Sequence, residues 1–211
     1  MQVLGRADSS NVQAVMWGAA ELGLAPERLD YGHRFGGTDT DAFRAMNPNG
    51  LVPVLRDGDL TLFESAAILR YLAARHGEGG PLWPADPAER ARIDQWAEWG
   101  KNTFASGFQR GIFMPLVRTP AATRDGAALD AATAAHLANC AILTARLGEG
   151  PYVCGAFSLA DVMIGHVLYR HEALGVEMSD GLRAYYDRLT ERQAFAEHVM
   201  VPFDALRHPD A

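Results

Sequence analysis

Three short polar segments in the first third of the chain have residue types that suit the binding of a small charged molecule. The first is residues 8–13, Asp-Ser-Ser-Asn-Val-Gln. Ser10 and Gln13 have the spacing of a helix capping box, which predicts Ser10 as the N-cap and leaves Ser9 free to face a ligand. Asn11 adds an amide donor in the same turn. The alternative is that these polar side chains only cap the helix.

The second segment is residues 47–55, Asn-Pro-Asn-Gly-Leu-Val-Pro-Val-Leu. Pro53 has no N–H for a sheet ladder, so it belongs at the start of a strand or on a sheet edge, and Val52 before it is held extended. An extended residue at an open edge can pair its N–H and C=O with a peptide ligand. The alternative is an ordinary turn that leads into a hairpin.

The third segment is Phe63-Glu-Ser, followed by a strongly helical run. Ser65 stands where that helix begins, so its hydroxyl and the free N–H groups of the first turn can hold a carboxylate. Glu64 beside it is an acceptor for an ammonium group. Together they suit the α-carboxylate and α-amine of an amino acid. The alternative is that Ser65 only caps its own helix.

The elements that must position these segments alternate in type over residues 1–78. Hydrophobic periodicity predicts the order β-α-β-α-β-β-α, which is an α+β fold with a mixed sheet and helices on its faces. The predicted strands are residues 2–5, 28–31, 52–56 and 61–63, and the predicted helices are residues 11–22, 38–45 and 65–76.

A linker rich in glycine and proline is expected at residues 79–88, followed by an all-helical domain over residues 89–211. This second domain carries no convincing strand pattern. The predicted helices are residues 89–114, 125–147, 158–174, 182–189 and 194–200.

The combination of NPNGLVPVL, ESAAILRYLA, a proline-rich linker and a helical remainder resembles the cytosolic glutathione S-transferases, in particular bacterial serine-type members of theta- and nu-like character. The resemblance implies a thioredoxin-like first domain, with Pro53 after a cis peptide bond. It implies that Val52 pairs with the cysteinyl backbone of glutathione and that Glu64 and Ser65 hold its γ-glutamyl end. Leu51 stands where many relatives have a polar residue, so one contact is missing or supplied elsewhere.

The same resemblance implies that a hydroxyl group near the first helix acts on the glutathione thiol. The region around Ser9 contains no cysteine, and the first strand and helix contain no tyrosine, which leaves serine-type chemistry. A free thiol has a pKa of about 8.5, and lowering it by two units needs about 2.7 kcal/mol. One hydrogen bond to a charged partner supplies about 1.5–3 kcal/mol. We expect Ser9 to donate it, with Ser10 as the alternative donor and Asn11 as a helper.

The second substrate is expected to be a small hydrophobic electrophile bound between the domains, against the helix at residues 89–114. The candidate lining residues are Trp99, Phe104, Phe108 and Phe113, with packing in the core as the alternative for each. Arg34 and Arg110 are candidates for the glycyl carboxylate of glutathione or for an acidic substrate. Phe157 and Ser158 to Asp161 resemble the staple and capping box of the family, which are folding features.

Composition argues against several other classes of protein. The net charge is −7 and Lys101 is the only lysine, which argues against a nucleic-acid surface. No apolar run is long enough for a membrane span, and the start of the chain lacks the pattern of a signal peptide. Cys140 and Cys154 form no metal or redox motif, which favours the cytoplasm. His166 and His171 do not share a helical face, so no metal is expected.

Three functions remain open at this stage. The first is conjugation of glutathione to electrophiles. The second keeps the glutathione site but catalyses peroxide reduction, isomerisation or dehalogenation. The third is a non-catalytic binding module on the same fold. The family resemblance also implies a homodimer.

Overall fold

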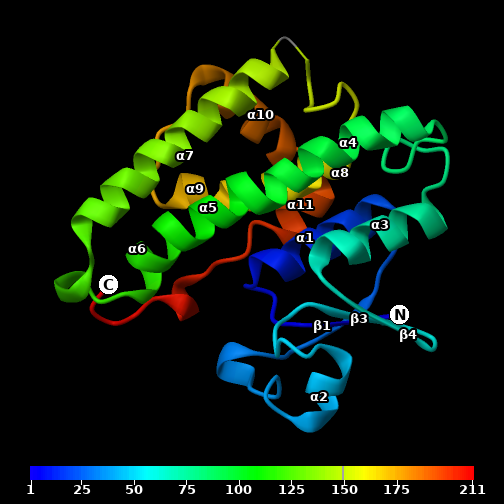
Figure 1. Cartoon of the computed structure of the whole chain (residues 1–211), viewed down its shortest axis with the longest axis horizontal. Coiled ribbons are helices and arrows are strands. Elements are labelled where there is room, and N and C mark those ends of the chain that lie inside the picture. Colours follow the sequence, from blue (N-terminus) through cyan, green and yellow to red (C-terminus); the bar gives the residue numbers. More distant parts are fainter. Residues whose placement is uncertain (149) are drawn as a thin grey trace.

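The computed structural model of the chain describes residues 1–148 and 150–211. Its N-terminal part is a four-stranded mixed sheet with helices on both faces, and the rest is mainly helical (Figure 1). The N-terminal elements are β1 (Gln2–Leu4), α1 (Ser10–Glu21), β2 (Glu27–Leu29), α2 (Asp41–Met46), β3 (Val54–Asp57), β4 (Leu60–Phe63) and α3 (Ser65–His76). This order confirms the predicted thioredoxin-like α+β architecture.

The sheet has the strand order β2-β1-β3-β4, with β1 parallel to β2 and antiparallel to β3. Successive side chains of a strand point to opposite faces, and the two faces are buried against different helices. Val3 and Leu55 pack into the large core that contains α1 and α3, whereas Leu4 and Val54 pack against Phe43 of α2. The sheet is therefore covered on both sides, with the first residues of α1 and α3 at the boundary with the helical part.

The helical part begins at Pro87 and is built around one central helix. Residues of α8 are buried all round, so α8 forms its core. The elements are α4 (Pro87–Trp99), the π-helical segment η2 (Gly100–Ala105), α5 (Ser106–Phe108), the π-helical segment η3 (Gln109–Phe113), α6 (Met114–Arg118), α7 (Gly126–Leu147), α8 (Leu159–Gly165), α9 (Leu168–Ala173), α10 (Asp180–Thr190) and α11 (Gln193–His198). The exact domain bounds drawn from the sequence stay a prediction.

The first long helix is longer and less regular than its sequence pattern predicts. It starts at Pro87 because the Asp86 carboxylate accepts a hydrogen bond from the Ala88 N–H at 3.1 Å. It then continues through η2 and η3 to the end of α6. At Gly100 it lies so close to α8 that a Cβ atom would come within 2.5 Å of the Ile164 side chain. Glycine is required there by this close approach.

The predicted single helix over residues 158–174 is wrong in its continuity. The structure has two helices, α8 and α9, with His166 and Val167 between them. The start of α8 confirms the expected capping box, because the buried Asp161 carboxylate accepts hydrogen bonds from the backbone and hydroxyl group of Ser158. Asp161 also accepts a hydrogen bond from the Tyr185 hydroxyl at 3.0 Å. These contacts are internal and support its role as a folding residue.

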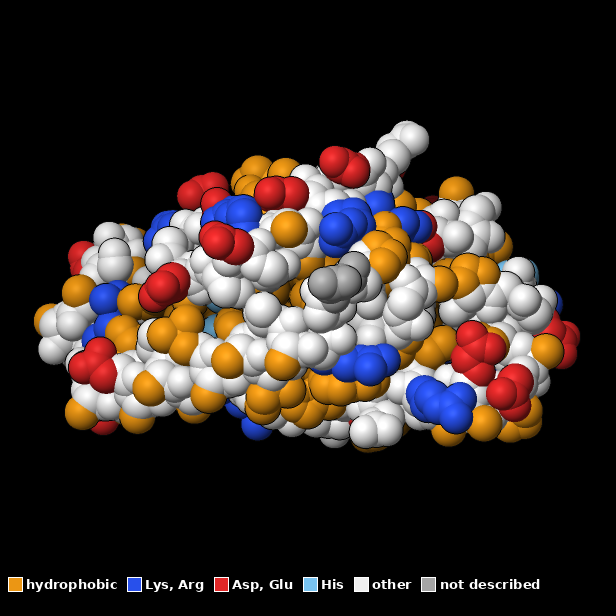
Figure 2. Space-filling model, turned by 90° about the horizontal axis from the view of Figure 1, so that it is seen from above, with side chains coloured by type: hydrophobic (Ala, Val, Ile, Leu, Met, Phe, Trp, Pro, Cys, Tyr) orange, Lys and Arg blue, Asp and Glu red, His pale blue; other side chains and the backbone are white. Residues whose placement is uncertain are grey.

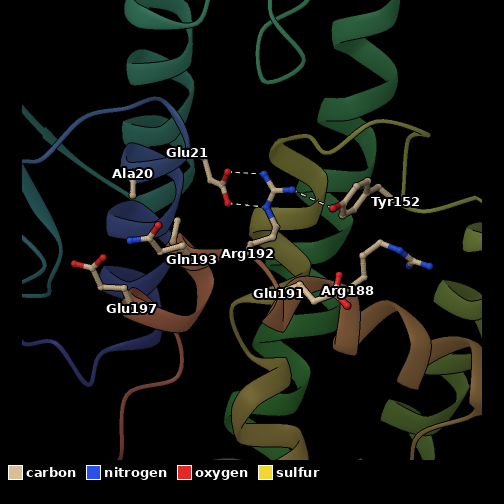
Figure 3. Close-up of a pocket in the computed structure, with 9 residues that line it drawn as sticks. Ala20, Glu21, Tyr152, Arg188, Glu191, Arg192, Gln193 and Glu197 are labelled. Carbon is tan, nitrogen blue, oxygen red and sulfur yellow. Dashed lines mark hydrogen bonds and ion pairs between the residues drawn. The ribbon is translucent and has the colours of Figure 1, made fainter.

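An ion pair braces the seam between the N-terminal part and α11. The Arg192 guanidinium group donates to both carboxylate oxygens of Glu21 and to the Tyr152 hydroxyl (Figure 3). These residues line a hollow of about 610 Å³. The polar groups that the close-up shows at its centre are already paired with one another, so this hollow is a structural joint and a poor candidate for a reaction site.

The helical side of the molecule carries charges of both signs. Figure 2 looks onto this side, where Lys and Arg side chains alternate with Asp and Glu side chains. Among the helices of the described residues, none has the length and apolar character of a membrane span.

Candidate active site

A cavity of about 350 Å³ lies where the sheet domain meets the long first helix of the helical part. On the sheet side it is lined by Ser10, Asn11, Leu51 and Glu64. These residues come from all three polar segments that the sequence singles out. The fold therefore brings the start of α1, the loop before β3 and the residue before α3 to one cavity.

The start of α1 differs by one residue from the predicted one. Ser9 has the extended backbone of an N-cap residue, and Ser10 is the first helical residue, so the prediction that Ser10 is the N-cap is wrong. Within the described chain, the Ser9 hydroxyl makes no capping hydrogen bond. Ser9 is 8% exposed and is not among the described residues that line the cavity, whereas Ser10 and Asn11 are. The structure thus leaves both hydroxyl groups as candidate donors.

The loop before β3 presents an open backbone edge. The Val52–Pro53 peptide bond is cis, as the family resemblance implies. The Asn47 side chain donates to the Leu51 carbonyl at 2.7 Å and accepts from the Asn49 N–H, so it holds this loop in place. Neither the N–H nor the C=O of Val52 is hydrogen-bonded to another described residue. This edge is free to pair with an extended ligand.

The start of α3 combines an unusual backbone with a link to α1. Glu64 has φ +70° and ψ +114°, which costs a non-glycine residue on the order of 1–3 kcal/mol and is typical of functional sites. Ser65 is buried, and its hydroxyl donates to the Asn11 side-chain oxygen at 3.2 Å. The reading of Ser65 as a helix cap is wrong, because Glu64 occupies the cap position. Lys101 on the helical side pairs with the Glu64 carboxylate.

The two arginines that the sequence offers for an acidic group have different places. Arg110 lines the cavity. Arg34 instead pairs with the buried carboxylate of Asp8, which also pairs with Arg6. Burial alone raises the pKa of Asp8, but the hydrogen bond from Arg34 and the charge of Arg6 outweigh it and lower that pKa. Arg34 is therefore engaged in a structural pair in this structure.

The predicted aromatic wall of the cavity is wrong for the three phenylalanines. Phe104, Phe108 and Phe113 have no exposed surface and pack in the core. Trp99 is half-buried against Trp96 and Phe104 and is not among the described lining residues. The opposite face of η2, α5 and η3 turns toward the cavity and is mostly polar: Lys101, Asn102, Ser106, Gln109 and Arg110.

A buried positive charge lies next to Asp8 and Ser9, just before the start of α1. The Arg170 guanidinium group is 2% exposed, donates to the Asp8 carbonyl at 2.7 Å and contacts the side-chain oxygens of Gln13 and Gln109. No carboxylate among the described residues pairs with it. Burial therefore lowers the pKa of Arg170 to about 9. A buried cation without a carboxylate in hydrogen-bond contact, next to the start of α1, favours a negative charge near that helix end.

Sequence reasoning did not find Lys101, Gln109, Arg170 or His166 as parts of this site. Lys101 is the only lysine of the chain, which is a usable signal. Arg170 lies in a strongly apolar helical run, where a charged residue requires a partner. His166 lies at the helix break that the sequence pattern did not predict.

Comparison with known proteins agrees with this geometry. Residues 1–74 match the family model described as Glutathione S-transferase, N-terminal domain. The chain is 41% identical to Glutathione S-transferase GstB of Escherichia coli (strain K12) over 94% of this chain and 97% of the relative. It is 34% identical to Glutathione S-transferase 3 of Zea mays over 94% and 93% of the two chains.

A solved structure is also similar over nearly the full length. The theta class glutathione S-transferase of Xanthomonas axonopodis pv. citri, solved with glutathione bound, has a TM-score of 0.88 and 42% identity, covering 95% of this chain and 97% of that chain. The open backbone edge at Val52 and the strained backbone of Glu64 agree with these comparisons. Because the chain is 41% identical to a glutathione S-transferase over nearly its full length, it belongs to the glutathione S-transferase family.

Proposed function

We propose that this chain transfers the thiolate of glutathione to small electrophiles in the cavity at the domain boundary. The observation that carries the proposal is the convergence of an unpaired Val52 backbone, the Glu64–Ser65 corner and the start of α1 on one cavity. An open backbone edge can pair with a peptide, and a helix N-terminus with polar side chains can bind the charged end of an amino acid or a thiolate. Glutathione carries all three features in one molecule.

In the proposed complex, the γ-glutamyl carboxylate lies at the N-terminus of α3 beside Ser65, and its ammonium group faces Glu64. The cysteinyl N–H and C=O pair with the free backbone groups of Val52. The thiol then points toward the start of α1. The Ser65–Asn11 hydrogen bond couples the first and last of these contacts, because it ties the two helix starts together.

The residues at the start of α1 stabilise the thiolate and do not attack the electrophile themselves. A serine hydroxyl donates a hydrogen bond to the sulfur, and the N-terminus of α1 and the buried cation of Arg170 add favourable electrostatics. We propose Ser9 as the donor, because its hydroxyl is not used in capping α1. Ser10 stays the alternative, because it lines the cavity.

The polar lining of the cavity narrows the class of the second substrate. Lys101, Gln109 and Arg110 face the position of the electrophile, whereas the predicted aromatic rings do not. We therefore propose an electrophile that carries a carboxylate or another polar group. This proposal differs from the small hydrophobic electrophile that the sequence predicts, and conjugation assays decide between them.

Titration calorimetry with glutathione, followed by conjugation assays, tests the proposal. We expect glutathione binding that Glu64→Gln weakens, and faster conjugation of an electrophile with a carboxylate than of its methyl ester. Retention of glutathione without turnover of either electrophile would favour a binding module. Absence of glutathione binding would overturn the proposed function. A homodimer and a cytoplasmic location remain proposals, which gel filtration and cell fractionation test.

A further inference from the structure

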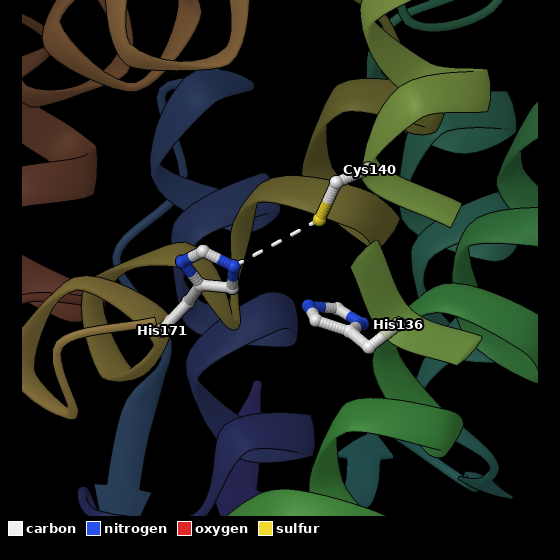
Figure 4. A group of neighbouring side chains, drawn as sticks. All are labelled: His136, Cys140 and His171. Atoms are coloured by element: carbon white, nitrogen blue, oxygen red, sulfur yellow. Dashed lines mark hydrogen bonds between the residues drawn. The ribbon is translucent and has the colours of Figure 1, made fainter. Parts of the chain in front are cut away.

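A second cluster of reactive side chains lies inside the helical domain, apart from the residues of the active-site cavity. His136 and Cys140 are one helical turn apart on α7, so they share a face of that helix. His171 comes from α9. One ligand atom from each residue lies within 4.8 Å of the others. In Figure 4 the two imidazole rings and the thiol face the space between the two helices.

The polar atoms of this cluster have few partners. All three side chains are more than nine-tenths buried: His136 is 2% exposed, Cys140 6% and His171 0%. Both ring nitrogens of His136 and the Nδ1 of His171 have no hydrogen-bond partner among the described residues. Buried polar atoms are nearly always satisfied, so each of these three needs an explanation. A metal ion bound by these ring nitrogens would explain why they have no hydrogen-bond partner.

The surroundings of the cluster are apolar. The ring of Phe104 packs on His136, and that of Phe108 packs on both histidines, with ring centroids 4.8–5.8 Å apart. Burial lowers the pKa of His136 to about 4 and that of His171 to about 3, and the charge of Arg183 acts in the same direction on His171. The unpartnered ring nitrogens of the two histidines leave a lone pair on each imidazole for a metal.

We propose that His136, Cys140 and His171 form a three-coordinate site for a soft monovalent metal ion of the copper(I) type. Imidazole and thiolate are the ligands that such an ion prefers. The assignment is independent of the proposed transferase activity.

The charge of the complex favours a monovalent ion over zinc. When the metal binds, the Cys140 thiol loses its proton to solvent and its sulfur forms the metal bond, so a monovalent cation and one thiolate give a neutral centre. A divalent ion would leave a net positive charge in an apolar interior, because no carboxylate among the described residues belongs to the group. Structural zinc also takes four ligands as a rule.

The geometry needs little adjustment. The Cys140 sulfur and the His171 Nε2 are 3.8 Å apart. A metal about 2.0–2.1 Å from nitrogen and about 2.3 Å from sulfur, at a trigonal angle, separates the two atoms by about 3.8 Å. The third ligand atom, on His136, lies within 4.8 Å of the other two. It therefore needs to move by roughly 1 Å to complete the trigonal site.

Anaerobic titration of the full chain with copper(I), against a chromophoric copper(I) chelator and without glutathione, tests the site. We expect one copper(I) per chain and release of one proton on binding. Cys140→Ser and His171→Phe should each weaken binding at least tenfold. The matched control is Cys154→Ser, which removes the other cysteine and should leave binding unchanged. Equal binding by Cys140→Ser and the parent chain would overturn the proposal.

Two further measurements do not depend on the folding of a variant. X-ray absorption of the copper-loaded parent chain should show one sulfur and two nitrogen neighbours, and any other ligand set contradicts the assignment. Zinc should bind more weakly than copper(I) by at least tenfold. Tighter binding of zinc would refute a site for a monovalent ion.

Discussion

The Lys101 ammonium group pairs with the Glu64 carboxylate at 2.5 Å, across the boundary between the two domains. Glu64 is also the residue with the left-handed backbone at the start of α3. The same carboxylate is the proposed partner of the ammonium group of glutathione. Lys101 therefore pairs with the same carboxylate that the ligand amine is expected to contact.

This competition predicts that Lys101→Met binds glutathione more tightly than the parent chain. Glu64 is largely exposed, and exposed ion pairs contribute about 0–1 kcal/mol, so we expect at most an about fivefold lower KM for glutathione. The kcat/KM for an electrophile with a carboxylate should fall, because a cationic lining residue is lost. Steady-state kinetics with both substrates varied measures the two effects. A higher KM for glutathione would show that Lys101 instead holds Glu64 in its binding geometry.

Ser9→Ala is expected to raise the pKa of the bound glutathione thiol by about one to two units. This is the equivalent of one hydrogen bond to a charged group, about 1.5–3 kcal/mol. Turnover at neutral pH should fall about tenfold to hundredfold and recover as the pH is raised through the new pKa. The pH dependence of kcat/KM and the thiolate absorbance of the binary complex measure the shift. The matched variant is Ser10→Ala, and a shift in that variant alone would reassign the donor.

Arg170→Met should lower activity without lowering stability. The guanidinium group is buried without a paired carboxylate, so its removal relieves a desolvation cost, which offsets the loss of its hydrogen bonds to the Asp8 carbonyl and to the Gln13 and Gln109 side chains. Loss of the positive charge should raise the pKa of the bound thiol. We therefore expect the pH–rate profile to shift while the Tm of thermal unfolding stays unchanged. A large fall in Tm would instead identify Arg170 as a mainly structural residue.

The free energy of unfolding should fall steeply as the pH drops below about 6.5. Burial lowers the pKa values of His136 and His166 to about 4 and that of His171 to about 3. In the unfolded chain these groups take up protons near pH 6.5, while in the folded chain they stay neutral, so the unfolded state binds more protons. Their contribution is complete above pH 6.5 and is lost as the pH falls toward 4 for His136 and His166 and toward 3 for His171, with up to about 1.4 kcal/mol per pH unit for each histidine.

Urea unfolding of the metal-free chain at several pH values measures this slope. His171→Phe should reduce it, and His76→Gln, at an exposed position, should not. An equal slope in the parent chain and His171→Phe would contradict the assignment.

Features that depend on local sequence were predictable. The bounds of α3 at residues 65 and 76 and the capping box of Ser158 and Asp161 follow from side chains within one or two helical turns. The order of strands and helices along residues 1–78 follows from the hydrophobic periodicity and from the hairpin turn, whereas the order of the strands within the sheet was not predicted. The three polar segments that meet at the cavity were also singled out, because together they resemble one family, while their role in binding stays a prediction.

Features that depend on contacts between distant elements were not predictable. Helical periodicity shows that Phe108 and Gln109 face different directions. It does not show that Phe108 turns into the core while Gln109 turns toward the cavity. The break between α8 and α9 at His166 has no local signal in the sequence. The cluster of His136, Cys140 and His171 needs two helices to meet, although the spacing of His136 and Cys140 was a partial signal in the sequence.

The π-helical segment η2 lets the protein family tolerate the deletion of one residue at this place. A deletion in an ordinary α-helix turns everything downstream by about 100° around the axis. A π-helical turn already contains an extra residue, so a deletion between residues 100 and 105 can be absorbed by a return to α-helical geometry. The helix face that carries Phe108 would still point into the core, while the residues that line the cavity around Lys101 would change. Relatives that are one residue shorter here should therefore share the core of this protein and differ in the electrophiles they accept.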